Sequence, residues 1–130
     1  MYRAMTRGIQ ITVRPRFIED ESSPAQARYF WAYTVEIANL GGETVQLTMR
    51  HWQITDGEGR QQEVRGPGVV GEEPVIAPGH SFTYTSGCPL ATPDGMMTGT
   101  YTMETPQGES FEVEIPLFPL DSPYVHRVVH

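Results

Sequence analysis

The sequence contains no lysine, a single cysteine and no long hydrophobic run, and each of these absences excludes a class of function. All nine positive charges are arginines, scattered along the chain. Without lysine, Schiff-base catalysis and the phosphate-binding loop of P-loop enzymes are excluded. The single cysteine, Cys88, excludes an intrachain disulfide and any zinc site with several cysteines. No apolar run approaches the roughly 18 residues that cross a membrane, so we expect no membrane insertion.

The net charge indicates which classes of partner the protein can bind, and the first residues indicate its cellular compartment. The formal net charge is −7. Because no basic stripe is present to replace the counterions around phosphates, we expect no nucleic-acid partner. The first residues lack the apolar segment of a signal peptide, and we expect a cytoplasmic protein.

Glycine, proline and the alternation of apolar residues all indicate β-structure. The chain of 130 residues holds 13 glycines and 11 prolines, which disfavour long helices. Between them, apolar residues recur at every second position, most clearly over residues 29–37. This pattern predicts an all-β fold, an antiparallel β-sandwich of the fibronectin type III or immunoglobulin-like kind with about seven to eight strands. No domain boundary is visible, and we expect one domain over residues 1–130.

One alternating segment changes parity, and several carry aromatic residues. Val45, Leu47 and Met49 share one face of the expected strand, whereas Trp52 and Ile54 fall on the other. A β-bulge near residues 50–51 would turn all five inward. The last strand is expected to alternate from Phe111 to Leu117. The aromatic residues expected between the two sheets are Tyr29, Trp31, Tyr33, Trp52, Phe82, Tyr84, Tyr101 and Phe111.

Residues 66–71 contain the pattern G-x-G-x-x-G, which in dinucleotide-binding proteins opens a helix. No helix is expected here, because Pro74 and Pro78 follow closely. The segment is therefore expected to be a loop between strands. One interpretation is conformational: the glycines permit positive φ, and Val69 and Val70 bury their side chains to hold the loop.

The other interpretation of this segment is an anion site. Backbone N–H groups of a glycine-rich turn can converge on a phosphate. On this hypothesis Arg65, Gly66, Gly68 and Gly71 contact a pyrophosphate-type ligand, with magnesium shared between the ligand and a carboxylate. Pro67 has no N–H to contribute, and Glu72 and Glu73 would repel a bare anion.

Metal-binding and catalytic patterns are sparse. His126 and His130 are four residues apart, but no third ligand is near, so we expect no metal site and no cofactor. The acidic runs 19–21 and 72–73 are typical of solvated turns. Cys88 has no histidine beside it in the sequence and is expected to be a packing residue. No spacing indicates a nucleophile or an acid–base pair, so we expect no catalytic residues and no enzyme.

Several segments together resemble a known family. They are residues 33–35, the Arg-His-Trp-Gln-Ile-Thr-Asp run at 50–56, residues 66–72, 77–79 and 82–87, and the closing Ile-Pro-Leu-Phe at 115–118. In this order they resemble the ApaG domain. The resemblance implies a fibronectin type III-like sandwich in a standalone bacterial protein associated with cobalt resistance and magnesium efflux. It also implies a protein-interaction module, because related domains serve that purpose in larger eukaryotic proteins, and no firm biochemical activity.

The C-terminal apolar segment 117–125 is interrupted by prolines and cannot run far as a central strand. It would either cover a sheet edge or pair with a second copy of the chain, so a homodimer is expected.

Three functions stay open. The leading one is a non-enzymatic interaction protein acting on divalent-cation homeostasis through an unidentified protein partner. The alternatives are a sensor of pyrophosphate or nucleotide, and an enzyme acting on phosphorylated nucleotides.

Overall fold

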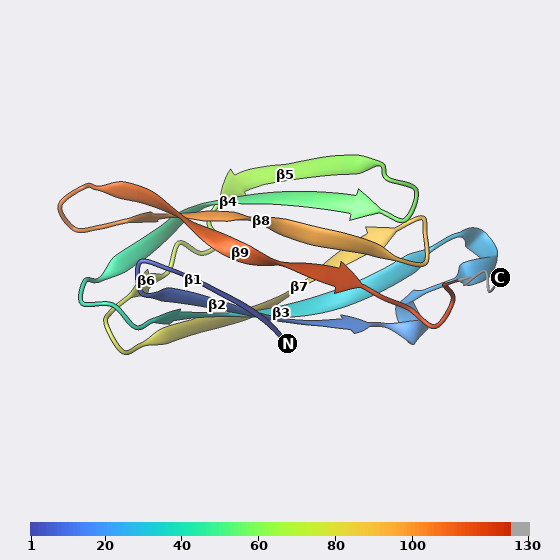
Figure 1. Cartoon of the computed structure of the whole chain (residues 1–130), viewed down its shortest axis with the longest axis horizontal. Helices are drawn as coiled ribbons and strands as arrows, with labels where there is room; N and C mark the ends of the chain where they lie inside the picture. Colours follow the sequence, from blue (N-terminus) through green and yellow to red (C-terminus); the bar gives the residue numbers. More distant parts are fainter. Residues whose placement is uncertain (126–130) are drawn as a thin grey trace.

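The computed structural model describes residues 1–125, which form two antiparallel sheets packed face to face (Figure 1). Two short 3-10 helices, η1 (Glu19–Glu21) and η2 (Pro24–Gln26), connect the second and third strands. The nine strands of these residues are β1 (Tyr2–Thr6), β2 (Ile9–Phe17), β3 (Tyr29–Asn39), β4 (Val45–Asp56), β5 (Gln61–Pro67), β6 (Val75–Ile76), β7 (Ser81–Leu90), β8 (Gly95–Glu104) and β9 (Ser110–Leu120).

The strand order confirms the predicted all-β sandwich. One sheet has the order β1-β2-β3-β7, and the other has the order β5-β4-β8-β9, with the two-residue β6 paired to β4. The alternation of apolar and polar residues in the sequence indicates three of these strands only weakly: β1, β5 and β6. In β5 only Val64 and Gly66 are even partly buried, so the edge strand shows little hydrophobic periodicity. Residues 126–130 lie outside the described part, and with them His126 and His130.

The core lies between the sheets and is rich in aromatic rings. Trp31, Tyr101 and Phe118 are among the largest fully buried side chains. Trp52 packs edge-on against Tyr33, with ring centroids 5.3 Å apart, and against Tyr101 and Phe118. The expected aromatic core is therefore present. Three of its predicted members are only partly buried and pack against its border: Tyr29, Phe82 and Phe111.

Because of two β-bulges, some side chains of β4 and β9 lie on the opposite face from the one that the sequence predicts. The register of β4 against β8 shifts between Leu47 and Met49, so the bulge precedes the predicted position and leaves Met49 42% exposed. On β9 a second shift, opposite residues 97–99, changes the parity of the strand. As a result Leu117 is 59% exposed, and Phe118 and Leu120 point into the core. A bulge adds one residue to one strand, which reverses every side chain beyond it.

The C-terminal segment covers one end of the first sheet. β9 is an edge strand that runs through both of its prolines to Leu120, as an edge position permits. Beyond it, the carbonyl oxygen of Asp121 accepts a hydrogen bond from the Trp31 indole nitrogen at 2.7 Å. The Tyr124 ring then packs on Phe17 and Tyr29. The segment therefore covers the ends of β2 and β3 within its own chain.

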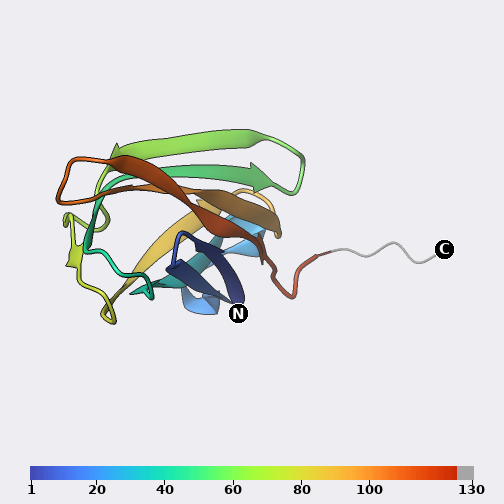
Figure 2. The ribbon, with the colours of Figure 1, turned by 60° about the vertical axis from the view of Figure 1, so that its left-hand side comes forward.

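The sandwich is closed along one side and open along the other. β1 and β9 meet where Glu114 N–H donates to Thr6 Oγ1 at 3.1 Å and the rings of Tyr2 and Phe118 pack together. Across the molecule β7 and β5 are the facing edges, and they lie in different layers in Figures 1 and 2. We call these the β1/β9 seam and the β5/β7 seam.

No helix of residues 1–125 is long and apolar enough to cross a membrane.

Candidate functional site

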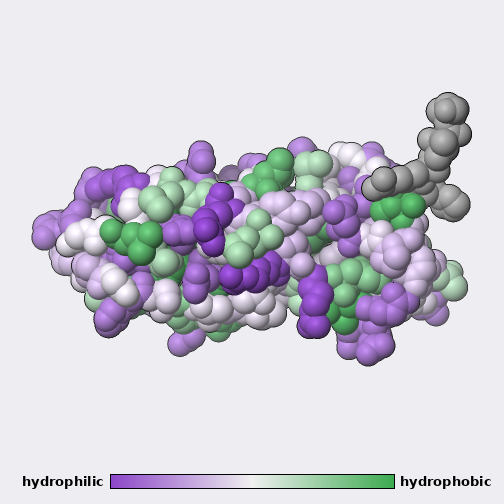
Figure 3. Space-filling view, turned by 60° about the horizontal axis from the view of Figure 1, so that its bottom comes forward, coloured by the Kyte–Doolittle hydropathy of each residue, from purple (hydrophilic) through white to green (hydrophobic). Residues whose placement is uncertain are grey.

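The β5/β7 seam holds a cavity of about 340 Å³. Its walls come from β3, β4, β5, β7 and β8, and the loop after β5 closes one end with Val69, Val70 and Gly71. A second hollow of about 300 Å³ shares Ile54, Gln62 and Pro89 with it. The two hollows adjoin each other between the edges of the sheets, and we call them together the groove. On the face shown in Figure 3, by contrast, hydrophobic side chains gather in small patches with hydrophilic ones between them.

Arg50 is the charged residue that lines the cavity. The bulge in β4 places it on the same face as Trp52 and Ile54, and it is half-buried. Its Nη1 donates to the carbonyl oxygens of Pro67 at 2.9 Å and Gly68 at 3.1 Å. Gly66 lies opposite Arg50 in the register, and a Cβ there would come within 2.9 Å of Nη1. The glycine thus leaves the space that the guanidinium occupies against β5.

Tyr33, Tyr84 and Cys88 line the cavity together with Arg50. Tyr84 and Tyr101 share a hydrogen bond between their hydroxyls, and Tyr33 lines the same cavity. Burial raises the pKa of all three tyrosines, and the Arg50 charge opposes that rise in each. Burial also raises the pKa of the Cys88 thiol to about 11. Cys88 is therefore a neutral thiol near pH 7, as expected of a packing residue.

The glycine loop is held mainly by its own backbone. Val69 and Glu72 exchange two backbone hydrogen bonds of 2.8 and 2.9 Å, and Gly68 N–H donates to the Thr48 carbonyl oxygen at 2.9 Å. Gly68 has a φ of +59°, and a Cβ there would lie 2.1 Å from the Glu72 carbonyl oxygen. Only glycine fits such a position. Val69 is buried as predicted, whereas Val70 is 55% exposed, contrary to the prediction.

The four residues of the predicted phosphate site lie in different settings. Arg65 and Gly66 belong to β5 rather than to the loop, and Gly68 and Gly71 follow it. Arg65 is exposed, does not line the cavity and has its Nη2 3.8 Å from Glu63 Oε2. Of the four, only Gly71 lines the cavity. Binding of pyrophosphate here stays a prediction.

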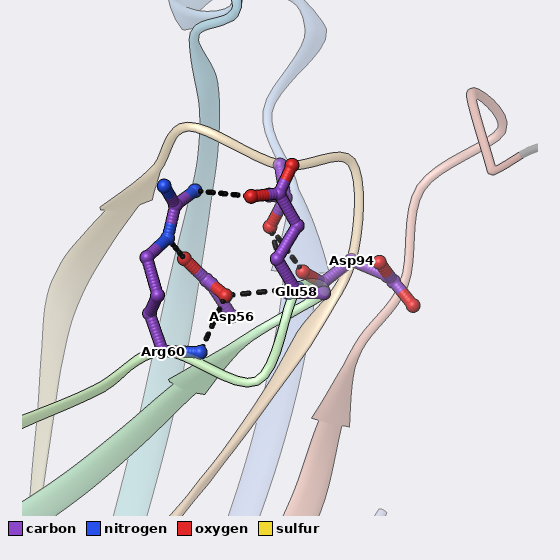
Figure 4. Close-up of polar contacts among 6 residues, drawn as sticks. Asp56, Glu58, Arg60 and Asp94 are labelled. Carbon is purple, nitrogen blue, oxygen red and sulfur yellow. Dashed lines mark hydrogen bonds and ion pairs between the residues drawn. The ribbon is translucent and has the colours of Figure 1, made fainter.

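Arg60, at the other end of the groove, shows a different electrostatic arrangement. Its side chain is held between two carboxylates, with Nε 2.7 Å from Asp56 Oδ2 and Nη2 3.1 Å from Glu58 Oε2 (Figure 4). The hydrogen bond from Arg60 lowers the pKa of Asp56. Asp94 lies nearby, but within residues 1–125 no three histidine, cysteine or acidic side chains form a metal-ligand group. Arg60 is neutralised by its neighbours.

Comparison with known proteins identifies the family. The model of the ApaG domain matches residues 19–105. The chain belongs to the ApaG domain family. Every residue that lines the cavity falls within the matched region.

Full-length relatives and a solved structure agree with this assignment. The chain is 68% identical to Protein ApaG of Methylorubrum extorquens (strain PA1) and 60% identical to Protein ApaG of Bradyrhizobium sp. (strain ORS 278), in both cases over 100% of each chain. It is similar to a crystal structure of an ApaA protein from Bordetella pertussis, with a TM-score of 0.86 and 51% identity. That match covers 90% of this chain and 95% of the other.

Proposed function

We propose that this ApaG-family chain is a non-enzymatic binding protein that receives a protein partner at the β5/β7 seam. The observation that carries the proposal is the pair of facing sheet edges. Among the described strands β5 pairs only with β4, and β7 pairs only with β3, so each presents one edge without a partner strand. An extended polypeptide can hydrogen-bond to such an edge and place alternate side chains in the groove between the sheets.

Two further features favour binding over catalysis. The neutral, buried thiol of Cys88 is a poor nucleophile near pH 7, because the thiolate is the reactive form. The tyrosine hydroxyls of the cavity have raised pKa values and act as donors rather than as bases. The cobalt resistance and magnesium efflux that the family resemblance implies would then be exerted in the cytoplasm, through the partner.

Site-specific photocrosslinking in cells tests this proposal. A benzophenone amino acid at Gln62, an exposed residue that lines the groove, should crosslink to a discrete protein identifiable by mass spectrometry. Met5 on β1, 58% exposed, is the matched control position and should not give that product. The same product from both positions, or none from Gln62, would count against the seam as the partner-binding surface.

A sensor of pyrophosphate or nucleotide is the second candidate, and a specific observation favours it. Gly71 lines the cavity beside Arg50 with a φ of +80°, and no atom lies within 4 Å of a Cβ built on it. An NMR titration with magnesium pyrophosphate should shift amides of residues 65–73 if this candidate is correct. Unchanged shifts would leave the loop structural. An enzyme acting on phosphorylated nucleotides would in addition show turnover of such substrates.

Homodimerisation through the C-terminal segment stays a prediction. The unpaired edge of β9 and the exposed Leu117 are the features that favour it. Light scattering at micromolar concentration should give about twice the mass of 14.6 kDa. A monomer would leave β9 as an edge protected by its prolines.

A further inference from the structure

Arg50 carries a positive charge without a neighbouring negative charge. Within residues 1–125 no ion pair joins Arg50 to a carboxylate, whereas Arg7 and Arg65 each have one and Arg60 has two. The other described arginines, with or without an ion pair, are all exposed, whereas Arg50 is half-buried in a cavity. A partly desolvated guanidinium without a counterion is costly, and an anion that enters the cavity would relieve that cost.

The orientation of the guanidinium is already fixed. Both bonds to the carbonyl oxygens of Pro67 and Gly68 come from Nη1. Within the described residues Nε and Nη2 donate no hydrogen bond, so one edge of the fork has two free N–H groups. A carboxylate matches two parallel N–H donors on such an edge. The two carbonyl contacts hold the fork in place before any ligand arrives, and the absence of a Cβ on Gly66 leaves the space for it.

The remaining walls of the cavity are suited to an apolar group. Val64 and Val70 supply accessible apolar surface, and the cavity volume of about 340 Å³ lies at the lower end of small-molecule sites. Ser86 adds a hydroxyl next to this surface. A dianionic phosphate would need more than the single positive charge that Arg50 supplies, because Arg65 does not line the cavity. Size, charge and polarity together fit a monoanion with an apolar body.

We propose that the Arg50 cavity binds a carboxylate carried by an apolar group. The carboxylate pairs with the Nε/Nη2 edge of Arg50, and the apolar group packs on Val64 and Val70. This chemistry has two sources: a free carboxylic acid, or the C-terminal carboxylate of a polypeptide that ends in an apolar residue. The inference goes beyond the proposed function, because it fixes the chemistry of the ligand whichever molecule carries it.

NMR titration with a matched acid and amide tests the inference directly. Phenylacetate and phenylacetamide are added to the protein in separate titrations, to about 20 mM, the range appropriate to a ligand of about ten non-hydrogen atoms. We expect phenylacetate to shift the Arg50 Nε–H and the amides of residues 69–71 and 86–88. Phenylacetamide should bind about tenfold more weakly, because it lacks the charge-assisted pair. Equal shifts with both, or none with the acid, would overturn the inference, as would stronger shifts with inorganic phosphate.

Two variants locate the charge that is responsible. Arg50→Gln should abolish the preference for acid over amide, whereas Arg60→Gln, which removes an arginine already paired with Asp56, should keep it. If Arg50→Gln does not fold, the comparison of acid and amide in the unaltered protein still decides. Loss of the preference in Arg60→Gln but not in Arg50→Gln would place the anion at the wrong end of the groove and overturn the inference.

A peptide probe separates the two sources of the carboxylate. Tighter binding of N-acetyl-alanyl-phenylalanine than of phenylacetate would support a C-terminal carboxylate, and equal binding would support a free acid. The outcome is also independent of the photocrosslinking. A crosslinked partner at Gln62 without acid preference would sustain the proposed function and reject this inference. Acid binding through Arg50 without a crosslinked partner would do the reverse.

Discussion

The two seams of the sandwich differ in what fills the space between the sheet edges. In the β1/β9 seam, protein groups meet one another: Arg7 lies 4.1 Å above the Phe111 ring and 3.0 Å from Glu109 Oε2. In the β5/β7 seam a cavity separates the edges, and Arg50 faces it without a carboxylate partner among residues 1–125. An arginine is thus held by a carboxylate on one side and lacks a carboxylate partner among the described residues on the other. On our proposals, this difference assigns stability and recognition to opposite edges of one core.

The largest expected effect comes from breaking the β1/β9 seam. Phe118 is fully buried and packs on Tyr2, Tyr33 and Trp52. Phe118→Ala should lower the free energy of unfolding by about 3–5 kcal/mol, measured by urea denaturation. Its neighbour Leu117 is the matched control, because the bulge leaves it exposed and Leu117→Ala should cost little. Similar losses in both variants would contradict the assignment of faces.

The second test concerns the loop that closes the β5/β7 seam. Gly68→Ala places a Cβ against the Glu72 carbonyl oxygen at a positive φ and should cost about 2–3 kcal/mol. Gly71→Ala also has a positive φ but meets open space, so its cost should be smaller, about 1 kcal/mol. Thermal denaturation of the two variants measures the difference. Equal stability of the two would mean that the Val69–Glu72 turn does not hold the loop.

A third test uses the buried thiol of the β5/β7 seam. Burial raises the pKa of Cys88 to about 11 in the folded protein, above its ordinary value of 9.0. Below pH 9 the thiol is neutral in both the folded and the unfolded chain, so its full contribution to stability is present there. The stability that this thiol contributes relative to alanine should fall between pH 9 and 11, by up to about 2 kcal/mol. The difference between the original protein and Cys88→Ala in urea denaturation, taken across that range, isolates the thiol from the tyrosines. A constant difference would show that the thiol reaches solvent.

The smallest expected effect is that of the ion pair in the β1/β9 seam. The hydrogen bond from Arg7 lowers the pKa of Glu109, so the contribution of this pair is present above the ordinary glutamate value and is lost as the pH falls. Arg7→Gln should raise the Glu109 pKa, measured by NMR titration, with little change in stability, because both side chains are exposed. A large loss of stability would mean that this pair, rather than the buried rings, closes the seam.

The fold could be predicted from alternation wherever strands bury one face. In β3 the alternation from Trp31 to Ile37 is regular, and the structure places these residues in the core. The β5 edge strand was not predicted, because Val64 is its only partly buried residue apart from Gly66. The positions of the bulges escaped as well. A parity change between Leu47 and Trp52 indicates that a bulge exists, whereas the register against β8 decides where it lies.

The cavity could not be read from the chain in the same way. Its residues come from β3, β4, β5, β7, β8 and a loop, and only the packing of two sheets brings them together. The G-x-G-x-x-G segment lies at one end of this cavity, which Val69, Val70 and Gly71 line. Its most visible charge, Arg65, does not line the cavity. The sequence did not single out Arg50, which stood only next to the predicted bulge. Its charge becomes significant because no ion pair joins it to a carboxylate within residues 1–125, and only the structure shows this.

The measurement that tests the central claim most directly is a set of intermolecular nuclear Overhauser effects between phenylacetate and the protein. The account predicts contacts from the ring protons of the ligand to the side chains of Val64 and Val70, inside the β5/β7 seam. Contacts confined to exposed apolar residues elsewhere, such as Leu40 or Leu117, would contradict it.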